Sequence, residues 1–146
     1  MQIRKASLND FNELYSIGKS IEEFKVSSIS EFMEVEEFKN AIKNIYGIFL
    51  LAEDENKIIG FIYADTNDID NKSNNCACLI YLCVLPEFRE KGIAKELYKK
   101  CENRLKTMDV KSLYAWASTK GSIINFLEKQ NFSKGHNNYI WMDKKL

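Results

Sequence analysis

The stretch CACLIYLCVLPEFREKGIAKELYKKCENRLKT, residues 76–107, decides the fold of this chain. Residues 76–85 are almost all apolar, which is typical of a strand covered on both faces. Pro86 ends that strand because proline lacks a backbone N–H. Beyond it, apolar residues recur every four positions, at Ile93, Leu97, Cys101 and Leu105. This spacing predicts an amphipathic helix from about residue 92 to residue 107.

Upstream of this stretch the sequence predicts three strands and two helices. An alternating strand is expected over residues 2–6, followed by a helix over residues 7–20 that begins with a capping box at its first and fourth residues. A second capping pattern begins a helix over residues 28–46. Residues 48–52 and 58–64 flank a polar turn, and this arrangement indicates an antiparallel hairpin.

Downstream we expect a strand over residues 112–117, a short helix over 122–129 and a closing strand over 139–143, with one more strand around Phe132. Residues 65–75 are too polar to pack, and they lack the glycine and the distal glutamate of a calcium loop, so an exposed loop is expected. No linker or repeat divides the chain. We therefore expect a single domain with an α/β fold, in which helices cover both faces of a mixed sheet.

The charges balance overall, with 21 Lys and Arg residues against 21 Asp and Glu residues. A net charge of zero removes the general attraction to phosphate backbones and anionic membranes, so neither nucleic acid nor a membrane is expected as a partner. The N-terminal residues lack the apolar run of a secretory signal, and no stretch approaches the roughly 20 apolar residues of a membrane span. We therefore expect a cytoplasmic protein, either a monomer or a homodimer.

The four cysteines, Cys76, Cys78, Cys83 and Cys101, do not have the two-residue spacing of zinc or redox motifs. The one histidine, His136, has no obvious partner for binding a metal. We therefore expect reduced, buried thiols and no bound metal.

The turn between the buried strand and the long helix has the composition of an anion site. Gly92 and Ala94 are small residues at the start of the helix, where unpaired N–H groups and the positive end of the helix dipole meet. A phosphate can approach such a main chain without meeting a β-carbon. Small residues at a helix start also serve packing alone. The position of this string between a strand and a long helix favours the phosphate interpretation.

In this setting Arg89, Gly92 and Ala94 resemble the Arg/Gln-x-x-Gly-x-Gly/Ala motif of the GNAT superfamily of acetyl-CoA-dependent N-acetyltransferases. The similarity in element order extends over essentially the whole chain. The resemblance implies a mixed, mostly antiparallel central sheet with helices on both faces. It also implies acetyl-CoA as the cosubstrate, no metal, and transfer of an acetyl group to a primary amine by direct attack. The amine, whether a small molecule or a peptide amine, is not identified by the sequence.

The same resemblance implies which residues bind the cosubstrate. Three strand residues are expected to pair through their main chain with the pantetheine arm, like an extra strand: Leu82, Cys83 and Val84. The pyrophosphate is expected against the main chain of Arg89, Glu90, Lys91, Gly92, Ile93 and Ala94. Residues 89–106 carry seven basic against three acidic side chains, a net charge of +4. Of these, Lys91 and Lys95 are expected nearest to the phosphates, and the other lysines form a solvated face.

The catalytic residues are not identified by the sequence. The family pattern of the penultimate helix is broken at Lys120, Leu127 and Asn131. Leu127 stands where many relatives have a tyrosine that protonates the leaving thiolate, and leucine cannot donate a proton. No carboxylate lies in residues 113–116, where some relatives have a catalytic glutamate. Three residues remain candidates, although each is also an ordinary residue of a strand or strand end: Ser118, Tyr81 and Tyr139.

Six glutamates against one lysine give residues 22–37 a net charge of −5. In the resembled fold this stretch borders the acceptor cleft, where acidic side chains would attract a cationic amine such as a polyamine, an aminoglycoside-like molecule or a basic peptide terminus. A solvated acidic helix face explains the same residues without a ligand. The residues concerned are Glu22, Glu23, Lys25, Glu31, Glu34, Glu36 and Glu37.

The sequence leaves two classes of function open. The first is an N-acetyltransferase that uses acetyl-CoA. The alternative is a non-catalytic CoA-binding sensor or interaction module of the same fold, which Leu127 favours. A third interpretation, a small α/β domain unrelated to CoA, predicts no CoA binding at all.

Overall fold

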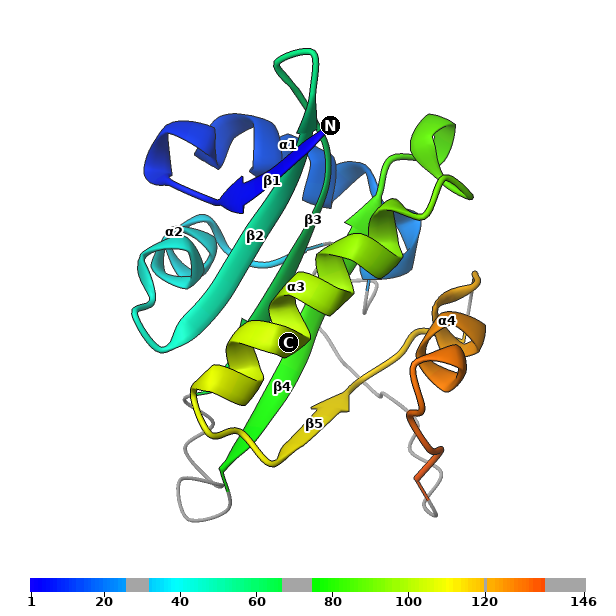
Figure 1. The fold of residues 1–146 in the computed structure, drawn as a ribbon. Coiled ribbons are helices and arrows are strands. Elements are labelled where there is room, and N and C mark those ends of the chain that lie inside the picture. The colour runs from blue at the N-terminus through cyan, green and yellow to red at the C-terminus, as the bar shows by residue number, and fades with distance from the viewer. Residues whose placement is uncertain (26–31, 67–74, 120, 136–146) are drawn as a thin grey trace, which may run out of the picture.

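The computed structural model describes residues 1–25, 32–66, 75–119 and 121–135, which form a five-stranded sheet with helices on both faces (Figure 1). The strands lie in chain order: β1 (Gln2–Lys5), β2 (Gly47–Asp54), β3 (Lys57–Asp65), β4 (Cys76–Val84) and β5 (Ser112–Ala115). Neighbouring strands are antiparallel except β4 and β5, which are parallel. The expected α/β fold with a mixed, mostly antiparallel sheet is therefore confirmed.

The helices divide between the two faces of the sheet. In Figure 1, α1 (Phe11–Ser20) and α2 (Val35–Lys43) lie behind the sheet, and α3 (Ile93–Thr107) crosses its front. α4 (Ile123–Lys129) follows β5 and packs on the α3 side. Three single turns of 3-10 helix complete the described elements: η1 (Leu8–Asp10), η2 (Glu22–Phe24) and η3 (Pro86–Phe88). The long helix that the sequence predicted after Pro86 is confirmed as α3.

Each face of the sheet has its own hydrophobic core, because successive side chains of a strand point to opposite faces. In β2, Ile48, Leu50 and Ala52 pack toward α3, whereas Phe49 and Leu51 pack toward α1 and α2. All five side chains are buried. Cover on both faces explains why this strand is a continuous apolar run in the sequence.

The second helix begins later than the sequence predicted. α2 starts at Val35, and residues 26–31, which hold the expected cap, lie outside the described residues. The ring of Phe32 packs against that of Tyr15 with 5.5 Å between centroids, and the Tyr15 hydroxyl donates a hydrogen bond to the carbonyl oxygen of Met33 at 3.0 Å. These contacts hold residues 32 and 33 against α1, and residues 32–34 are not helical.

The strand expected around Phe132 is wrong. That residue follows α4 in a segment without regular structure, where its ring packs edge-on against Tyr98 of α3 with 6.1 Å between centroids. The aromatic side chain serves the α3 core rather than a sheet. The closing strand expected over 139–143, like His136, lies outside the described residues.

The cysteines remain thiols. Cys83 and Cys101 are buried, whereas Cys76 and Cys78 are half-buried, so the expectation of buried thiols holds for two of them. The described residues contain no group of three or more His, Cys, Asp or Glu side chains that could hold a metal ion. Within the same ranges no helix is both long enough and apolar enough to cross a bilayer.

An ion cluster ties β1 to the start of α1. Arg4 donates through Nη1 and Nη2 to the two carboxylate oxygens of Asp10 at 2.9 and 2.7 Å, and through Nε to Glu53 at 2.8 Å. The backbone N–H of Ser7 also donates to Asp10 at 2.8 Å, so the expected pairing of Ser7 with Asp10 is confirmed. The hydrogen bonds from Arg4 are the main reason why the pKa of Asp10 falls from 3.8 to about 2.

This cluster predicts a loss of stability in acid. Because the pKa of Asp10 is lower in the folded than in the unfolded state, its contribution is present above about pH 4 and is lost as the pH falls toward 2. We expect Asp10→Asn to lower the free energy of unfolding at pH 7 by about 1–2 kcal/mol and to have a much smaller effect near pH 2. Urea unfolding at both pH values measures this difference.

The matched control is Glu128→Gln, which removes the exposed ion pair between Glu128 and Lys134. Such a pair contributes between about 0 and 1 kcal/mol, so little change is expected. An equal loss for Asp10→Asn at both pH values would contradict the role of its charge.

Candidate functional site

The sheet separates between β4 and β5. The two strands pair over only four residues each, and on β4 this pairing ends at Leu79. At that point β4 has an extra residue, Ile80, relative to β3, because Tyr63 lies opposite Tyr81 and Ala64 lies opposite Leu79. Such a bulge bends the strand that carries it. Beyond Leu79 no strand of the described residues pairs with this edge of β4.

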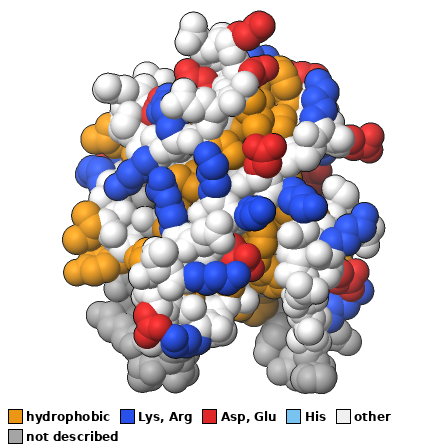
Figure 2. All heavy atoms as spheres, in the orientation of Figure 1, with side chains coloured by type: hydrophobic (Ala, Val, Ile, Leu, Met, Phe, Trp, Pro, Cys, Tyr) orange, Lys and Arg blue, Asp and Glu red, His pale blue; other side chains and the backbone are white. Residues whose placement is uncertain are grey.

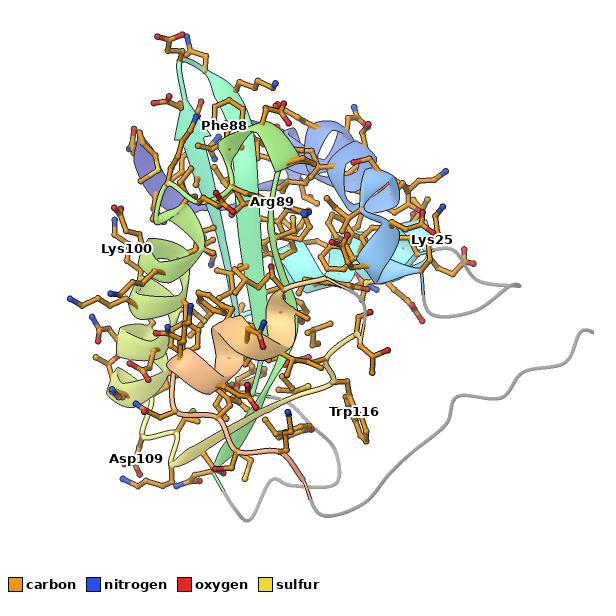
Figure 3. The ribbon with its side chains drawn as sticks, turned by 90° about the vertical axis from the view of Figure 1, so that its right-hand side faces the viewer. Lys25, Phe88, Arg89, Lys100, Asp109 and Trp116 are labelled. Carbon is orange, nitrogen blue, oxygen red and sulfur yellow. The ribbon has the colours of Figure 1, made fainter. Side chains whose placement is uncertain are left out.

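A groove of about 1480 Å³ lies where the strands separate. It is lined by β4 from Leu79 to Val84, together with η2, the first turn of α3, the end of β5 and α4. Arg89 and Trp116, which belong to the lining, lie above and below α4 in Figure 3. Residues 80–82 are only half-buried. The sequence predicted that this strand is covered on both faces. That prediction is wrong at residues 80–82, which the groove exposes.

The free edge of β4 presents main-chain groups to this groove. The backbone N–H of Leu85 donates to the carbonyl oxygen of Ile59 on β3 at 2.9 Å. Main-chain groups alternate between the two edges of a strand, so those of Leu82 and Val84 point away from β3. The carbonyl oxygen of Val84 accepts a hydrogen bond from Nε of Arg89 at 3.0 Å. The N–H and C=O of Leu82 and the N–H of Val84 remain at the groove, whereas the main chain of Cys83 faces β3.

The loop before α3 has the geometry of an anion site. Glu90 and Gly92 both have left-handed backbones, with φ of 64° and 82°. Gly92 is the N-cap of α3, and a β-carbon built on it would meet no atom within 4 Å. The N–H groups of the first helical turn have no acceptor within the helix. An anion can therefore approach the positive end of α3 through open space.

The basic side chains near this loop have different positions. Lys95 lines the groove, whereas Nζ of Lys91 lies 5.1 Å from the centre of the Phe88 ring and outside the lining. Arg89 turns back to Val84 and forms an ion pair with Glu23 at 3.4 Å. Lys and Arg side chains gather along α3 in the space-filling view (Figure 2). Of the two lysines expected near the phosphates, only Lys95 faces the groove.

The glutamates of residues 22–37 also have different positions: some line the groove and others do not. Glu22 and Glu36 form ion pairs with Lys25 and Lys39, which are neighbours in the sequence. Glu23 and Glu37 line the groove, and Glu37 has no ion-pair partner among the described residues. Glu31 lies outside those residues. Two of the six glutamates therefore face the groove, and the solvated-face interpretation fits Glu22 and Glu36.

The candidates for acid–base chemistry do not form a catalytic set. Leu127 is buried in the α3 core, although its position borders the groove. Ser118 also lines the groove. Burial raises the pKa of Tyr81 to about 12, so this side chain is neutral at pH 7 and can donate a hydrogen bond. Lys120 and Tyr139 lie outside the described residues.

Sequence reasoning did not identify the aromatic side chains of the groove. Phe24, Phe32 and Trp116 all belong to its lining. Phe24 lies in η2, a single turn with no periodic pattern, and Phe32 was expected inside a helix. Trp116 follows β5 and is 73% exposed. For Phe24 the only signal in the sequence was an apolar side chain in a polar segment, whereas Phe32 and Trp116 stand in apolar patterns that predicted a helix and a strand.

Comparison with known proteins agrees with this geometry. A model of the acetyltransferase (GNAT) family matches residues 9–132. No curated protein matches the sequence significantly.

Many solved structures have a similar fold. PaiA N-acetyltransferase from Thermoplasma acidophilum, in complex with coenzyme A, is 23% identical, with a TM-score of 0.69 over 89% of this chain and 87% of that one. An aminoglycoside 6'-N-acetyltransferase from Acinetobacter haemolyticus is 19% identical, with a TM-score of 0.71 over 100% and 99%. A transcriptional regulator from Bacillus halodurans C-125 is 16% identical, with a TM-score of 0.76 over 97% and 99%. At these identities the similarity establishes the fold.

The thiols of the groove strand and of α3 are expected to be unreactive. Burial raises the pKa of both Cys83 and Cys101 to about 12, and only the thiolate is nucleophilic. We expect a thiol reagent at pH 8 to modify Cys76 and Cys78 first in the native protein, and all four cysteines in urea. Mass spectrometry after timed labelling measures the order. Fast labelling of Cys83 in the native protein would contradict its burial.

Proposed function

Because this chain belongs to the GNAT acetyltransferase family, we propose that it transfers an acetyl group from acetyl-CoA to a primary amine. The observation that carries this proposal is the open loop before α3 next to a free strand edge in one groove. Family membership supports acetyl transfer, and two of the similar structures are N-acetyltransferases, one of them with coenzyme A. The choice of an amine as the acceptor is supported by these similar structures rather than by the family itself.

The groups of this groove fit a ligand with a pyrophosphate and an amide-containing arm. The N–H groups at the start of α3 would hold the pyrophosphate, with Nζ of Lys95 adding positive charge. Leu82 and Val84 would hydrogen-bond the amides of the arm, as an added strand does. Cys83 would contribute only packing, because its main chain faces β3. The side chain of Arg89 would fix the end of β4 rather than touch phosphate.

The chemistry needs few side chains of this protein. When bound, acetyl-CoA supplies an activated thioester carbonyl. The N–H of Leu82, the first free donor after the bulge, would stabilise negative charge that develops on the carbonyl oxygen. The amine attacks as the neutral base, so a cationic acceptor first loses its ammonium proton to water. A carbon–nitrogen bond then forms and the carbon–sulfur bond breaks, a second proton leaves the nitrogen, and one proton is added to the departing sulfur. Positioning in the groove can supply much of the rate.

We assign no side chain to either proton transfer. Leu127 cannot protonate the thiolate. Tyr81 is a weak acid whose hydroxyl has no hydrogen-bond partner among the described residues, and Ser118 is the other hydroxyl of the lining. Water can also serve, because the groove is open to solvent.

The alternative function is a non-catalytic CoA-binding sensor or interaction module. The buried Leu127 favours it, since the position that supplies the acid in many relatives holds an apolar core residue. A similar fold described as a transcriptional regulator is consistent with a role other than catalysis. Both functions require that CoA bind at the loop before α3 and along the free edge of β4.

We also propose that the protein acts in the cytoplasm and that its acceptor is cationic. The four cysteine thiols support a reducing compartment. Glu23 and Glu37 support a cationic ligand, because both carboxylates line the groove and Glu37 has no ion-pair partner among the described residues.

Substitution of Gly92 tests the phosphate site. A side chain at this position would project into the open space before α3, so Gly92→Glu would put bulk and negative charge where the phosphates are proposed to bind. We expect loss of CoA binding in titration calorimetry. Gly92→Asn is the matched control for the backbone, because asparagine tolerates the left-handed region better than most residues. It should retain more affinity than Gly92→Glu, and both variants should remain folded by circular dichroism.

Unchanged CoA affinity of Gly92→Glu would contradict the phosphate site. The control separates loss of backbone geometry from the effect of the carboxylate, because both variants share the unfavourable φ of 82°.

Turnover separates the enzyme from the binding module. We expect thiol release from acetyl-CoA above the no-enzyme control with at least one amine of a broad panel. CoA at 100 times its dissociation constant should stabilise the fold by about 2.7 kcal/mol in either case. Stabilisation by CoA without turnover of any amine would favour the binding module, and no stabilisation would contradict both functions.

A further inference from the structure

Three aromatic rings line one half of the groove. The ring of Tyr81 on β4 lies 4.8 Å from that of Phe24 in η2 and 5.3 Å from that of Phe32, centroid to centroid. Phe24 and Phe32 lie 5.9 Å apart, with 12° between their planes. All three belong to the groove lining on the side of α1 and α2. The three residues are called the aromatic wall below.

The aromatic wall is fixed before any ligand binds. Phe32 packs so closely on α1 that a β-carbon built at Gly18 would lie 2.2 Å from its ring, and hence only glycine leaves it room. The hydroxyl of Tyr15 holds the next residue, Met33, through its carbonyl oxygen. Phe24 also contacts the ring of Phe61 in the buried core at 6.2 Å. Because these side chains are already ordered, a ligand loses less binding free energy to the entropy cost of ordering the site.

Among the described residues, two of the three rings of the wall are only partly covered, whereas Phe32 is buried. Phe24 and Tyr81 are half-buried and pack against the core from one side, and Met33 and Ile80 extend the apolar lining in the same way. Apolar surface that remains open in a groove is typical of a ligand site. An aromatic face also attracts a cation that lies over it.

Two carboxylates accompany the wall. Glu37 lines the groove without an ion-pair partner among the described residues, and its charge contributes to the raised pKa of Tyr81. Glu23 precedes Phe24 and pairs with Arg89 at 3.4 Å. The acceptor half therefore combines flat apolar surface with negative charge, and Glu37 is the carboxylate that is not already neutralised.

We propose that the acceptor is an arylalkylamine-type molecule, a cationic amine on a flat apolar body, and not a polyamine or a polyhydroxylated amino sugar. This inference rests on the proposed acetyl transfer. The ring of the acceptor would pack against Phe24 and Tyr81, whose planes are tilted by 57°. Its ammonium would be attracted by Glu37 and the aromatic faces, and it would lose one proton to water before the neutral amine attacks the thioester. Tyr81 is adjacent to Leu82, so an amine on a short chain would reach the free strand edge. The hydroxyls of an amino sugar would lose water against these rings without gaining partners.

The experiment compares 2-phenylethylamine, spermidine and kanamycin as acceptors, each by thiol release and by calorimetric titration into the CoA-loaded protein. We expect kcat/KM and affinity to be highest for 2-phenylethylamine. Phe24→Ala should lower both by about tenfold, since an aromatic pair is worth about one factor of ten. Phe24→Leu should recover part of the loss. Glu37→Gln should raise KM for 2-phenylethylamine more than it lowers kcat.

The matched control is Glu36→Gln, which changes a carboxylate on the same helix that is paired with Lys39 and lies outside the groove lining. It should leave all values unchanged. Thermal unfolding of every variant shows whether it has lost its fold. Phe24 is chosen over Phe32 because its side chain is the more exposed of the two, so its removal disturbs the core less.

Each outcome decides the inference. Preference for 2-phenylethylamine that Phe24→Ala removes supports it. Equal or better use of spermidine or kanamycin overturns it, as does failure of 2-phenylethylamine to bind. Binding of 2-phenylethylamine that depends on Phe24, without turnover of any amine, supports the ligand class and instead contradicts the proposed acetyl transfer.

Discussion

β4 keeps its hydrogen bonds to β3 along nearly its whole length but loses its pairing with β5 after Leu79. The groove depends on this arrangement, in which β4 stays paired with β3 on one edge and is unpaired on the other. The contact with β3 is close, since a β-carbon at Gly60 would lie 2.6 Å from the carbonyl oxygen of Cys83. Held firmly on one edge and bent by the bulge at Ile80, the strand can leave its other edge open without loss of the sheet.

Much of the fold could be predicted because its elements have strong patterns. The four-residue spacing of apolar residues placed α3 correctly, and the continuous apolar runs placed β2, β3 and β4. Long-range packing limited the rest. Phe32 continued a helical pattern, yet its ring is needed against Tyr15, so the helix starts later. Phe132 was expected in a strand, but its ring packs edge-on against that of Tyr98 instead.

The candidate site divides in a similar way. The open loop at the start of α3 could be predicted because Gly92 and Ala94 form a local string between two recognisable elements. The side of the groove that carries the aromatic wall is built from segments far apart in the sequence, among which Phe24 and Tyr81 meet only in three dimensions. Net charge predicted that acidic side chains would gather near it, but only the ion pairs in the structure separate Glu37 from Glu36.

The loop before α3 offers an anion its main chain, while the guanidinium of Arg89 is occupied by Val84 and Glu23. Recognition by backbone dipoles leaves most side chains of such a loop free to change during evolution, provided that the left-handed turn at Gly92 persists. Sequences can then diverge far while the shape survives. This accounts for a chain that shares its architecture with proteins of 16–23% identity although no curated sequence matches it.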